Sequence, residues 1–101
     1  MLEEKIMFKD LDPILHSQLR LSIVSILISV DEANFSFIKE TTKATSGNIS
    51  IQIKKLQEAG YIQVEKSFKN NYPNTSISIT SKGIKAFETY VENLKKYINP
   101  K

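Results

Sequence analysis

The sequence predicts a mainly α-helical fold with one small β-hairpin, an α+β class. Apolar residues recur with helical spacing in four segments, and they alternate with polar residues only between residues 61 and 80. Glycine and proline number three each, which favours regular structure with few loops. With 101 residues, 41% of them hydrophobic and 25% charged, the chain has the size and composition of one globular domain, residues 1–101.

The first long helix is expected over residues 13–30 and ends at a polar break, residues 31–34. Asp12 accepts hydrogen bonds from the free N–H groups of a first turn, and Pro13 suits the first helical position. Apolar side chains surround this helix almost completely, and such a helix is buried on several sides. In so small a chain, this predicts a central helix that also meets a partner subunit.

Two shorter helices are expected next, over residues 35–42 and 46–59. Each follows a residue type that caps helix N-termini: Asn34 or Ser36 for the first helix and Thr45 for the second. The second helix has apolar residues at i, i+4 and i+7, so it is amphipathic. These residues are Ile49, Ile53 and Leu56.

A β-hairpin is expected after Gly60, which suits the left-handed conformation that ends a helix. Alternation of apolar and polar residues predicts strands at residues 61–66 and 75–80. The segment between them, residues 67–74, lacks a pattern and is expected to be a long loop. Pro73 lies in that loop, where it removes no hydrogen bond from the sheet.

A last helix is expected over about residues 81–98, with Thr80 as its cap. Its apolar stripe is broad and needs a cover, which is either the rest of the domain or a second copy of the chain. We favour the second copy, because a chain of this size has a limited core of its own. The predicted dimer interface comprises Leu2, Ile6, Leu15, Ile84, Phe87, Val91, Leu94 and Ile98.

A short helix, a tight turn and an amphipathic helix form a helix-turn-helix over about residues 35–59, and a hairpin over about residues 61–80 makes it winged. Several segments occur in the same order and spacing as in a known family: Leu11 to His16 with Arg20 and Leu21, Thr45 to Ser50, Lys55 to Ile62, Val64 to Lys66 and Thr80 to Gly83. On these segments the chain resembles small winged-helix DNA-binding proteins related to the MarR and ArsR transcriptional regulators. The resemblance implies a homodimer that binds operator DNA as a transcriptional regulator.

The distribution of charge independently points to a polyanionic partner. The net charge is +3, but residues 36–85 hold eight lysines against three glutamates, whereas residues 1–35 hold six acidic side chains against three basic ones. The helix over residues 46–59 is the predicted reader of the major groove, because short polar and basic residues lie opposite its apolar face. Its predicted DNA-binding residues are Thr45, Ser46, Gly47, Asn48, Ser50, Ile51, Gln52, Lys54 and Lys55.

The roles of these residues follow from their chemistry. Asparagine and glutamine can pair with adenine, lysines neutralise phosphates, and the first-turn N–H groups can bind a phosphate. Thr45 is expected to cap the helix, and Ser46 and Asn48 either cap it or also contact DNA. Gly47 is expected to allow close approach of one backbone to another. Ile51 either touches a thymine methyl group or packs on the wing.

The wing, residues 66–74, is expected to contact the minor groove or the backbone of DNA through Lys66, Lys69, Asn70 and Asn71. Related proteins usually carry arginine here, and a more strongly hydrated lysine argues against deep insertion. A flexible, solvated loop is the alternative. Phe68 and Tyr72 are expected to staple the hairpin rather than stack on bases.

Other classes of function find little support. Cysteine is absent and His16 is the only histidine, so neither a cysteine metal sensor nor another metal site is expected, and no cofactor is predicted. No phosphate-binding glycine loop or nucleophile–base pair points to an enzyme. Arg20 is expected to pair with an acidic neighbour.

The main alternative function is a winged-helix protein–protein interaction module that does not bind DNA. RNA binding is disfavoured because no aromatic platform for single strands is present. No segment is long and apolar enough to span a membrane, and the acidic start lacks the apolar run of a signal peptide. We therefore expect a cytoplasmic protein, whose small-molecule effector, if one exists, is unknown.

Overall fold

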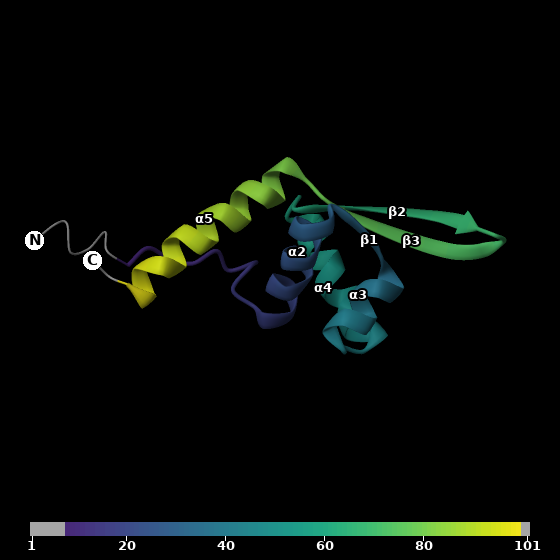
Figure 1. The fold of residues 1–101 in the computed structure, drawn as a ribbon, viewed down its shortest axis with the longest axis horizontal. Helices are drawn as coiled ribbons and strands as arrows, with labels where there is room; N and C mark the ends of the chain where they lie inside the picture. The colour runs from purple at the N-terminus through teal and green to yellow at the C-terminus, as the bar shows by residue number, and fades with distance from the viewer. Residues whose placement is uncertain (1–7, 100–101) are drawn as a thin grey trace, which may run out of the picture.

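The computed structural model describes residues 8–99, and within them four helices and three strands form an α+β fold, as predicted. Helices α2, α3 and α4 pack together beside the sheet, whereas the hairpin and α5 extend from this body in opposite directions (Figure 1). The molecule is consequently elongated, measuring 62 × 25 × 21 Å. In chain order the elements are α2 Gln18–Val30, β1 Glu32–Asn34, α3 Phe35–Thr42, α4 Ser46–Glu58, β2 Ile62–Lys69, β3 Tyr72–Ile79 and α5 Ser81–Ile98.

The first helix begins later than predicted, at Gln18 instead of Pro13. Asp12 does cap a turn, because its Oδ1 accepts from the N–H of Ile14 at 2.8 Å. The turn does not continue into the helix, because Ser17 is extended, with φ −152° and ψ 126°, and the carbonyl oxygen of Ile14 accepts from Nε of Arg20 at 2.6 Å. In a continuous helix that carbonyl would accept from the N–H of Gln18.

The sheet has three antiparallel strands in the order β1-β3-β2, one more than the predicted hairpin. The missed strand, β1, occupies the predicted break and pairs with residues 76–78 of β3. A strand of three residues is too short to show an alternating pattern, although Ala33 at its centre is buried against Ile77. Asp31, with a φ of 69°, turns the chain from α2 into this strand.

The hairpin is longer and tighter than predicted, because residues 67–69 and 72–74 form paired strands instead of a loop. Only Asn70 and Asn71 form the turn, with φ values of 53° and 68°. Asparagine tolerates this left-handed region, and two such residues fit the type I′ turn that suits a two-residue hairpin. Pro73 lies within β3 opposite Phe68, beyond the reach of β1, so its missing N–H breaks no pairing.

The predicted helix caps are confirmed. The side chain of Asn34 accepts from the N–H of Phe37, that of Thr45 accepts from Asn48, and that of Thr80 accepts from Gly83. Gly60, with a φ of 83°, follows α4 in the left-handed conformation, also as predicted. These caps satisfy N–H groups that have no partner within the helix.

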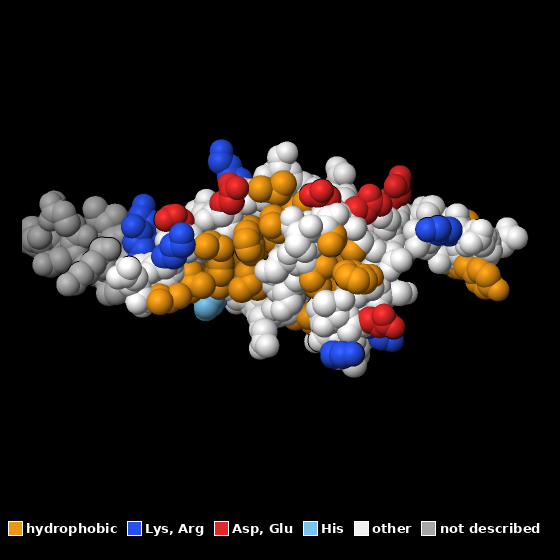
Figure 2. Space-filling model, in the orientation of Figure 1, with side chains coloured by type: hydrophobic (Ala, Val, Ile, Leu, Met, Phe, Trp, Pro, Cys, Tyr) orange, Lys and Arg blue, Asp and Glu red, His pale blue; other side chains and the backbone are white. Residues whose placement is uncertain are grey.

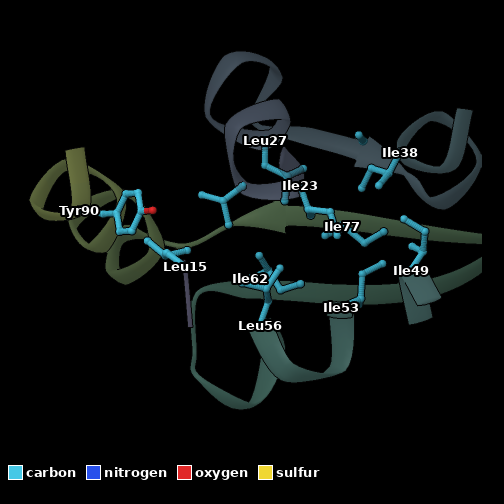
Figure 3. Packing of buried hydrophobic residues seen from close by; sticks show 12 residues of the cluster. Leu15, Ile23, Leu27, Ile38, Ile49, Ile53, Leu56, Ile62, Ile77 and Tyr90 are labelled. Atoms are coloured by element: carbon cyan, nitrogen blue, oxygen red, sulfur yellow. The ribbon is translucent and has the colours of Figure 1, made fainter. Parts of the chain in front are cut away.

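One buried cluster joins α2, α3, α4 and the sheet. In Figure 3 the apolar side of α4 points at residues of β2 and β3, and Leu15 lies beside Tyr90 of α5. This packing fixes the orientation of α4, so its opposite side faces solvent. The cluster consists of Leu15, Ile23, Val24, Leu27, Ala33, Ile38, Ile49, Ile53, Leu56, Ile62, Ile77 and Tyr90.

Polar contacts join the segment before α2 to α5 and to Tyr61, which lies between α4 and β2. Tyr97 donates its hydroxyl proton to the carbonyl oxygen of Lys9 at 2.8 Å, and His16 Nδ1 lies 3.1 Å from the hydroxyl of Tyr90. Tyr61 donates to Oδ2 of Asp12 at 2.5 Å. Burial, the hydrogen bond to Asp12 and the charge of that carboxylate together raise the pKa of Tyr61 from 10.0 to about 12.

This raised pKa predicts a loss of stability in alkali. Folded Tyr61 holds its proton more tightly than the unfolded chain does, so its contribution is complete below pH 10 and disappears as the pH rises towards 12. Tyr61→Phe should therefore be less stable than the wild type at pH 9, by about 1 kcal/mol for the lost hydrogen bond, and the gap should narrow by pH 11.5. Urea unfolding at both pH values measures this, and a constant gap would contradict it.

Candidate nucleic-acid interface

The helix-turn-helix is formed by α3, a short turn and α4. Lys43 adopts the left-handed conformation, with a φ of 63°, and its N–H donates to the carbonyl oxygen of Lys39 at the end of α3. Thr45 then caps α4. Because Ile49, Ile53 and Leu56 hold the inner side of α4 in the core, the first turn and the outer side of this helix stay available to a partner.

The structure exposes nearly all the residues of α4 that the sequence predicts for DNA binding. Only Gln52 is partly buried, on the side of the helix that faces α2. Ile51 is 55% exposed and does not line the groove beside the wing. Of its two predicted roles, packing on the wing is therefore disfavoured, and contact with a thymine methyl group stays a prediction. The exposed residues are Thr45, Ser46, Gly47, Asn48, Ser50, Ile51, Lys54 and Lys55.

A groove of about 370 Å³ runs between α4 and the base of the wing. The register explains why helix and wing share it, since Lys66 lies opposite Thr75 on the sheet face where Val64 lies opposite Ile77. Lys54 enters the groove from the helix and Lys66 from the wing, so two positive charges line a single concave surface. The groove is lined by Phe35, Ser50, Ile53, Lys54, Gln57, Val64, Lys66 and Thr75.

The tip of the wing presents exposed polar and basic side chains: Lys69, Asn70 and Asn71. Phe68 and Tyr72 are 77% and 73% exposed. The prediction that they staple the hairpin is wrong, because the register pairs Phe68 with Pro73 and Lys69 with Tyr72 and so puts the two rings on opposite faces of the sheet.

Gly47 makes no close approach to another backbone within this chain. A Cβ atom placed on Gly47 meets no atom within 4 Å. The close approach occurs instead at Gly83 of α5, where a Cβ atom would lie 2.2 Å from the carbonyl oxygen of Tyr61. Gly47 is therefore open to solvent in the first turn of α4.

Some residues of this surface were missed by sequence analysis. Phe35 and Thr75 line the groove, which only the strand register and the packing of α3 reveal. Arg20 was expected to pair with an acidic side chain, but it donates from Nη1 to Oε1 of Gln52 at 2.5 Å and from Nε to the carbonyl oxygen of Ile14. No spacing in the sequence signals a contact between residues 32 positions apart.

The residues predicted for a dimer interface fall into three groups. Leu15 is fully buried in the core of its own chain, so it offers no surface to a second chain and its assignment is corrected. Leu2 and Ile6 lie outside the described residues. The remaining five lie along α5, where Phe87 and Leu94 are partly buried against the core of their own chain and Ile98 is 76% exposed. Figure 2 shows hydrophobic side chains gathered along α5 and continuing towards α2.

Residues 8–99 hold neither a cluster suited to a metal ion nor a helix suited to span a membrane. Within them, no group of three or more histidine, cysteine, aspartate or glutamate side chains is placed to hold a metal ion. None of the helices in this part of the chain has the length and apolar character needed to cross a membrane.

Residues 19–98 match the family described as a winged helix DNA-binding domain. The match runs from α2 to the end of α5 and includes the helix-turn-helix and the wing. An uncharacterized protein of Methanocaldococcus jannaschii is 35% identical over 78 residues, which are 77% of this chain and 85% of that protein.

Two solved structures share the fold. A transcriptional regulator homologue from Pyrococcus horikoshii OT3 superposes with a TM-score of 0.83 at 29% identity, over 98% of this chain and 96% of that one. A protein of Thermoplasma acidophilum superposes with a TM-score of 0.70 at 23% identity, over 83% of this chain and 86% of that one. The second likeness is one of fold alone.

Proposed function

This chain belongs to the winged helix DNA-binding domain family, and we propose that it is a sequence-specific transcriptional regulator that binds double-stranded DNA as a homodimer. The observation that carries the proposal is the lysine-lined groove between α4 and the wing, next to the exposed first turn of α4. A helix of this kind fits the major groove, while a wing follows the backbone or the neighbouring minor groove. Membership of the MarR or ArsR group stays a prediction.

Each exposed group has a proposed role at the DNA. The N–H groups of Ser46 and Gly47 lie in the first turn of α4, and the open space over Gly47 admits a phosphate there. Lys54 neutralises phosphates, as do Lys55 and the wing lysines Lys66 and Lys69. Polar side chains at the tip, Asn70 and Asn71, contact the minor groove or the backbone. Asn48, Ser50 and Ile51 contact the edges of the bases in the major groove.

Support for the homodimer comes from α5. Its inner side packs on the core through Phe87, Tyr90 and Leu94, but Ile84 and Val91 are not among the residues that pack there. Ile84, Val91 and Ile98 are spaced by seven residues, so they lie along one edge of the helix. A second α5 would bury this edge, and a two-fold axis would then present two α4 helices to neighbouring major grooves.

The test is the dependence of DNA affinity on salt. If the dimer neutralises about six to ten phosphates, the logarithm of the affinity should fall with that of the salt concentration with a slope of about −5 to −9. Affinity should then drop about 10³- to 10⁵-fold between 50 and 200 mM salt. Binding of fluorescent random duplexes, followed by anisotropy over that range, measures the slope.

Lys54→Ala provides the internal check, because loss of one phosphate contact in each subunit should reduce the magnitude of the slope by about 1 per contact and weaken all sequences alike. A slope near zero, or no retention of DNA at 50 mM salt, would contradict the proposal. That result would favour the alternative of a protein–protein interaction module.

A further inference from the structure

A chain of side-chain hydrogen bonds connects α2 with the exposed first turn of α4. Arg20 Nη1 donates to Gln52 Oε1 at 2.5 Å, and Gln52 Nε2 donates to Asn48 Oδ1 at 2.9 Å. Gln52 is partly buried, whereas Asn48 is exposed on the proposed DNA-binding surface. Arg20 is itself fixed on its other side, because Nε donates to the carbonyl oxygen of Ile14 at 2.6 Å.

The donor character of arginine determines the direction of both hydrogen bonds in this series. A guanidinium group has only donors and stays charged, so the atom of Gln52 that faces it must be the oxygen. The amide nitrogen of Gln52 must then face Asn48, and the atom of Asn48 that meets it must be its oxygen. The oxygen and nitrogen of an amide are otherwise interchangeable in shape, but here one fixed donor orients two amides in succession.

The consequence is that Asn48 offers its amide NH₂ group to a partner, whereas its oxygen faces Gln52 and has one of its two lone pairs engaged. The pairing of asparagine with adenine requires both a donor and an acceptor on the same amide. A group that offers mainly donors matches guanine better, because guanine presents two acceptors, N7 and O6, in the major groove. The adenine contact expected from residue type alone is therefore disfavoured by the surroundings of Asn48.

We propose that Arg20, acting through Gln52, is a positioning residue that orients the Asn48 amide and thereby selects guanine at the base pair that Asn48 contacts. This inference rests on the proposed function, since it requires α4 to lie in the major groove. Arg20 has no DNA contact of its own in this scheme. Its effect is to hold the reading amide in one orientation before DNA arrives, which reduces the ordering needed on binding.

The sharpest test is an isosteric substitution that reverses the hydrogen bond between residue 52 and Asn48. In Gln52→Glu the carboxylate still accepts from Arg20 but cannot donate to Asn48. Asn48 must then turn its NH₂ group towards residue 52 and its oxygen towards the DNA. The preferred base at that position should change from guanine to one with an exocyclic amino group, cytosine or adenine, by about 5- to 100-fold in relative affinity.

Gln57→Glu is the matched control. It makes the same chemical change on the same helix, but Gln57 lines the groove beside the wing, as Gln52 does not, and it lies outside the series of hydrogen bonds. Both variants add a negative charge and should weaken binding to all duplexes. Only Gln52→Glu should change which base is preferred. Thermal melting of the free proteins checks that both variants fold.

The measurement is selection from a randomised duplex pool by wild type and both variants, with sequencing of the bound fraction. Substitution of 7-deazaguanine at the selected position should weaken the wild type and leave Gln52→Glu unaffected. Salt-sensitive retention of the pool with the same base preference in all three proteins would overturn the role of Arg20 while leaving DNA binding intact. No retention of the pool by the wild type would overturn both proposals.

Discussion

Replacement of Gly83 by alanine is expected to destabilise the protein by about 3 kcal/mol, the upper end of the usual cost of overpacking. The added Cβ atom would lie 2.2 Å from the carbonyl oxygen of Tyr61 and 2.9 Å from Cδ1 of Ile79. The isoleucine methyl can move, but the carbonyl is held by the N–H of Thr80 at 3.0 Å. The overlap between the added Cβ atom and this carbonyl oxygen can therefore be relieved only if α5 moves away from the corner between α4 and β2.

Gly47→Ala is the control for this prediction. Gly47 also lies in the first turn of a helix, yet a Cβ atom there meets nothing within 4 Å. The same substitution should raise stability there by about 0.5–1 kcal/mol, because alanine has the higher helix propensity. Urea unfolding of both variants measures the difference. Similar stability changes in the two would show that the contact at Gly83 is not the cause.

The contact at Gly83 matters because it sets the direction of α5. Thr80 caps α5 through Gly83, and its hydroxyl also donates to the carbonyl oxygen of Gly60 at 2.7 Å. The end of α4 and the start of α5 are thus joined through one threonine and one close backbone contact. In the proposed dimer, this corner would determine the separation of the two α4 helices.

The helices were predictable from sequence to the extent that their signals are local. Thr45 and Thr80 cap their helices as expected, and Gly60 ends its helix with a positive φ. The start of α2 was not predictable, because Asp12 and Pro13 do form a turn, the chain is then extended at Ser17, and the side chain of Arg20 binds the carbonyl oxygen of Ile14. A local pattern shows which conformation a segment prefers but not which side chain competes for its carbonyl.

The strands, too, were predictable only where their signal is local in the sequence. Ile62 and Val64 alternate with polar residues and were recognised, whereas β1 is too short to alternate. The outer hairpin, by contrast, contains aromatic, basic and amide residues that carry no apolar alternation. Its pairing depends on the turn at Asn70 and Asn71, which two left-handed residues make tight.

The exposed side of α4 could also be predicted, because it lies opposite an apolar stripe whose spacing is regular. The groove and the hydrogen bonds of Gln52 could not be. Lys54 and Lys66 meet across it only because of the strand register, and Arg20 reaches Gln52 only because α2 packs against α4. Residue type alone favours adenine for Asn48, and only this packing reveals that its oxygen is already engaged.

Val91→Glu is expected to convert the proposed dimer to a monomer and to lower affinity for a two-half-site operator by about 10²- to 10⁴-fold. Val91 is partly buried but is not among the residues packed on the core of its own chain, so a charge there should disturb folding little. In an isologous interface two carboxylates would be buried near the axis without partners, which is strongly unfavourable. Loss of the second subunit removes the gain that comes from a linked second half-site.

Lys96→Glu introduces a carboxylate on the polar side of the same helix and should leave both assembly and affinity close to those of the wild type. Sedimentation equilibrium gives the mass, and titration of duplexes with one or two half-sites gives the affinity. For a single half-site, Val91→Glu and the wild type should differ little, because each α4 and wing still makes its own contacts. A dimeric Val91→Glu with unchanged operator affinity would exclude this edge of α5 from the interface, and a monomeric wild type would refute the dimer itself.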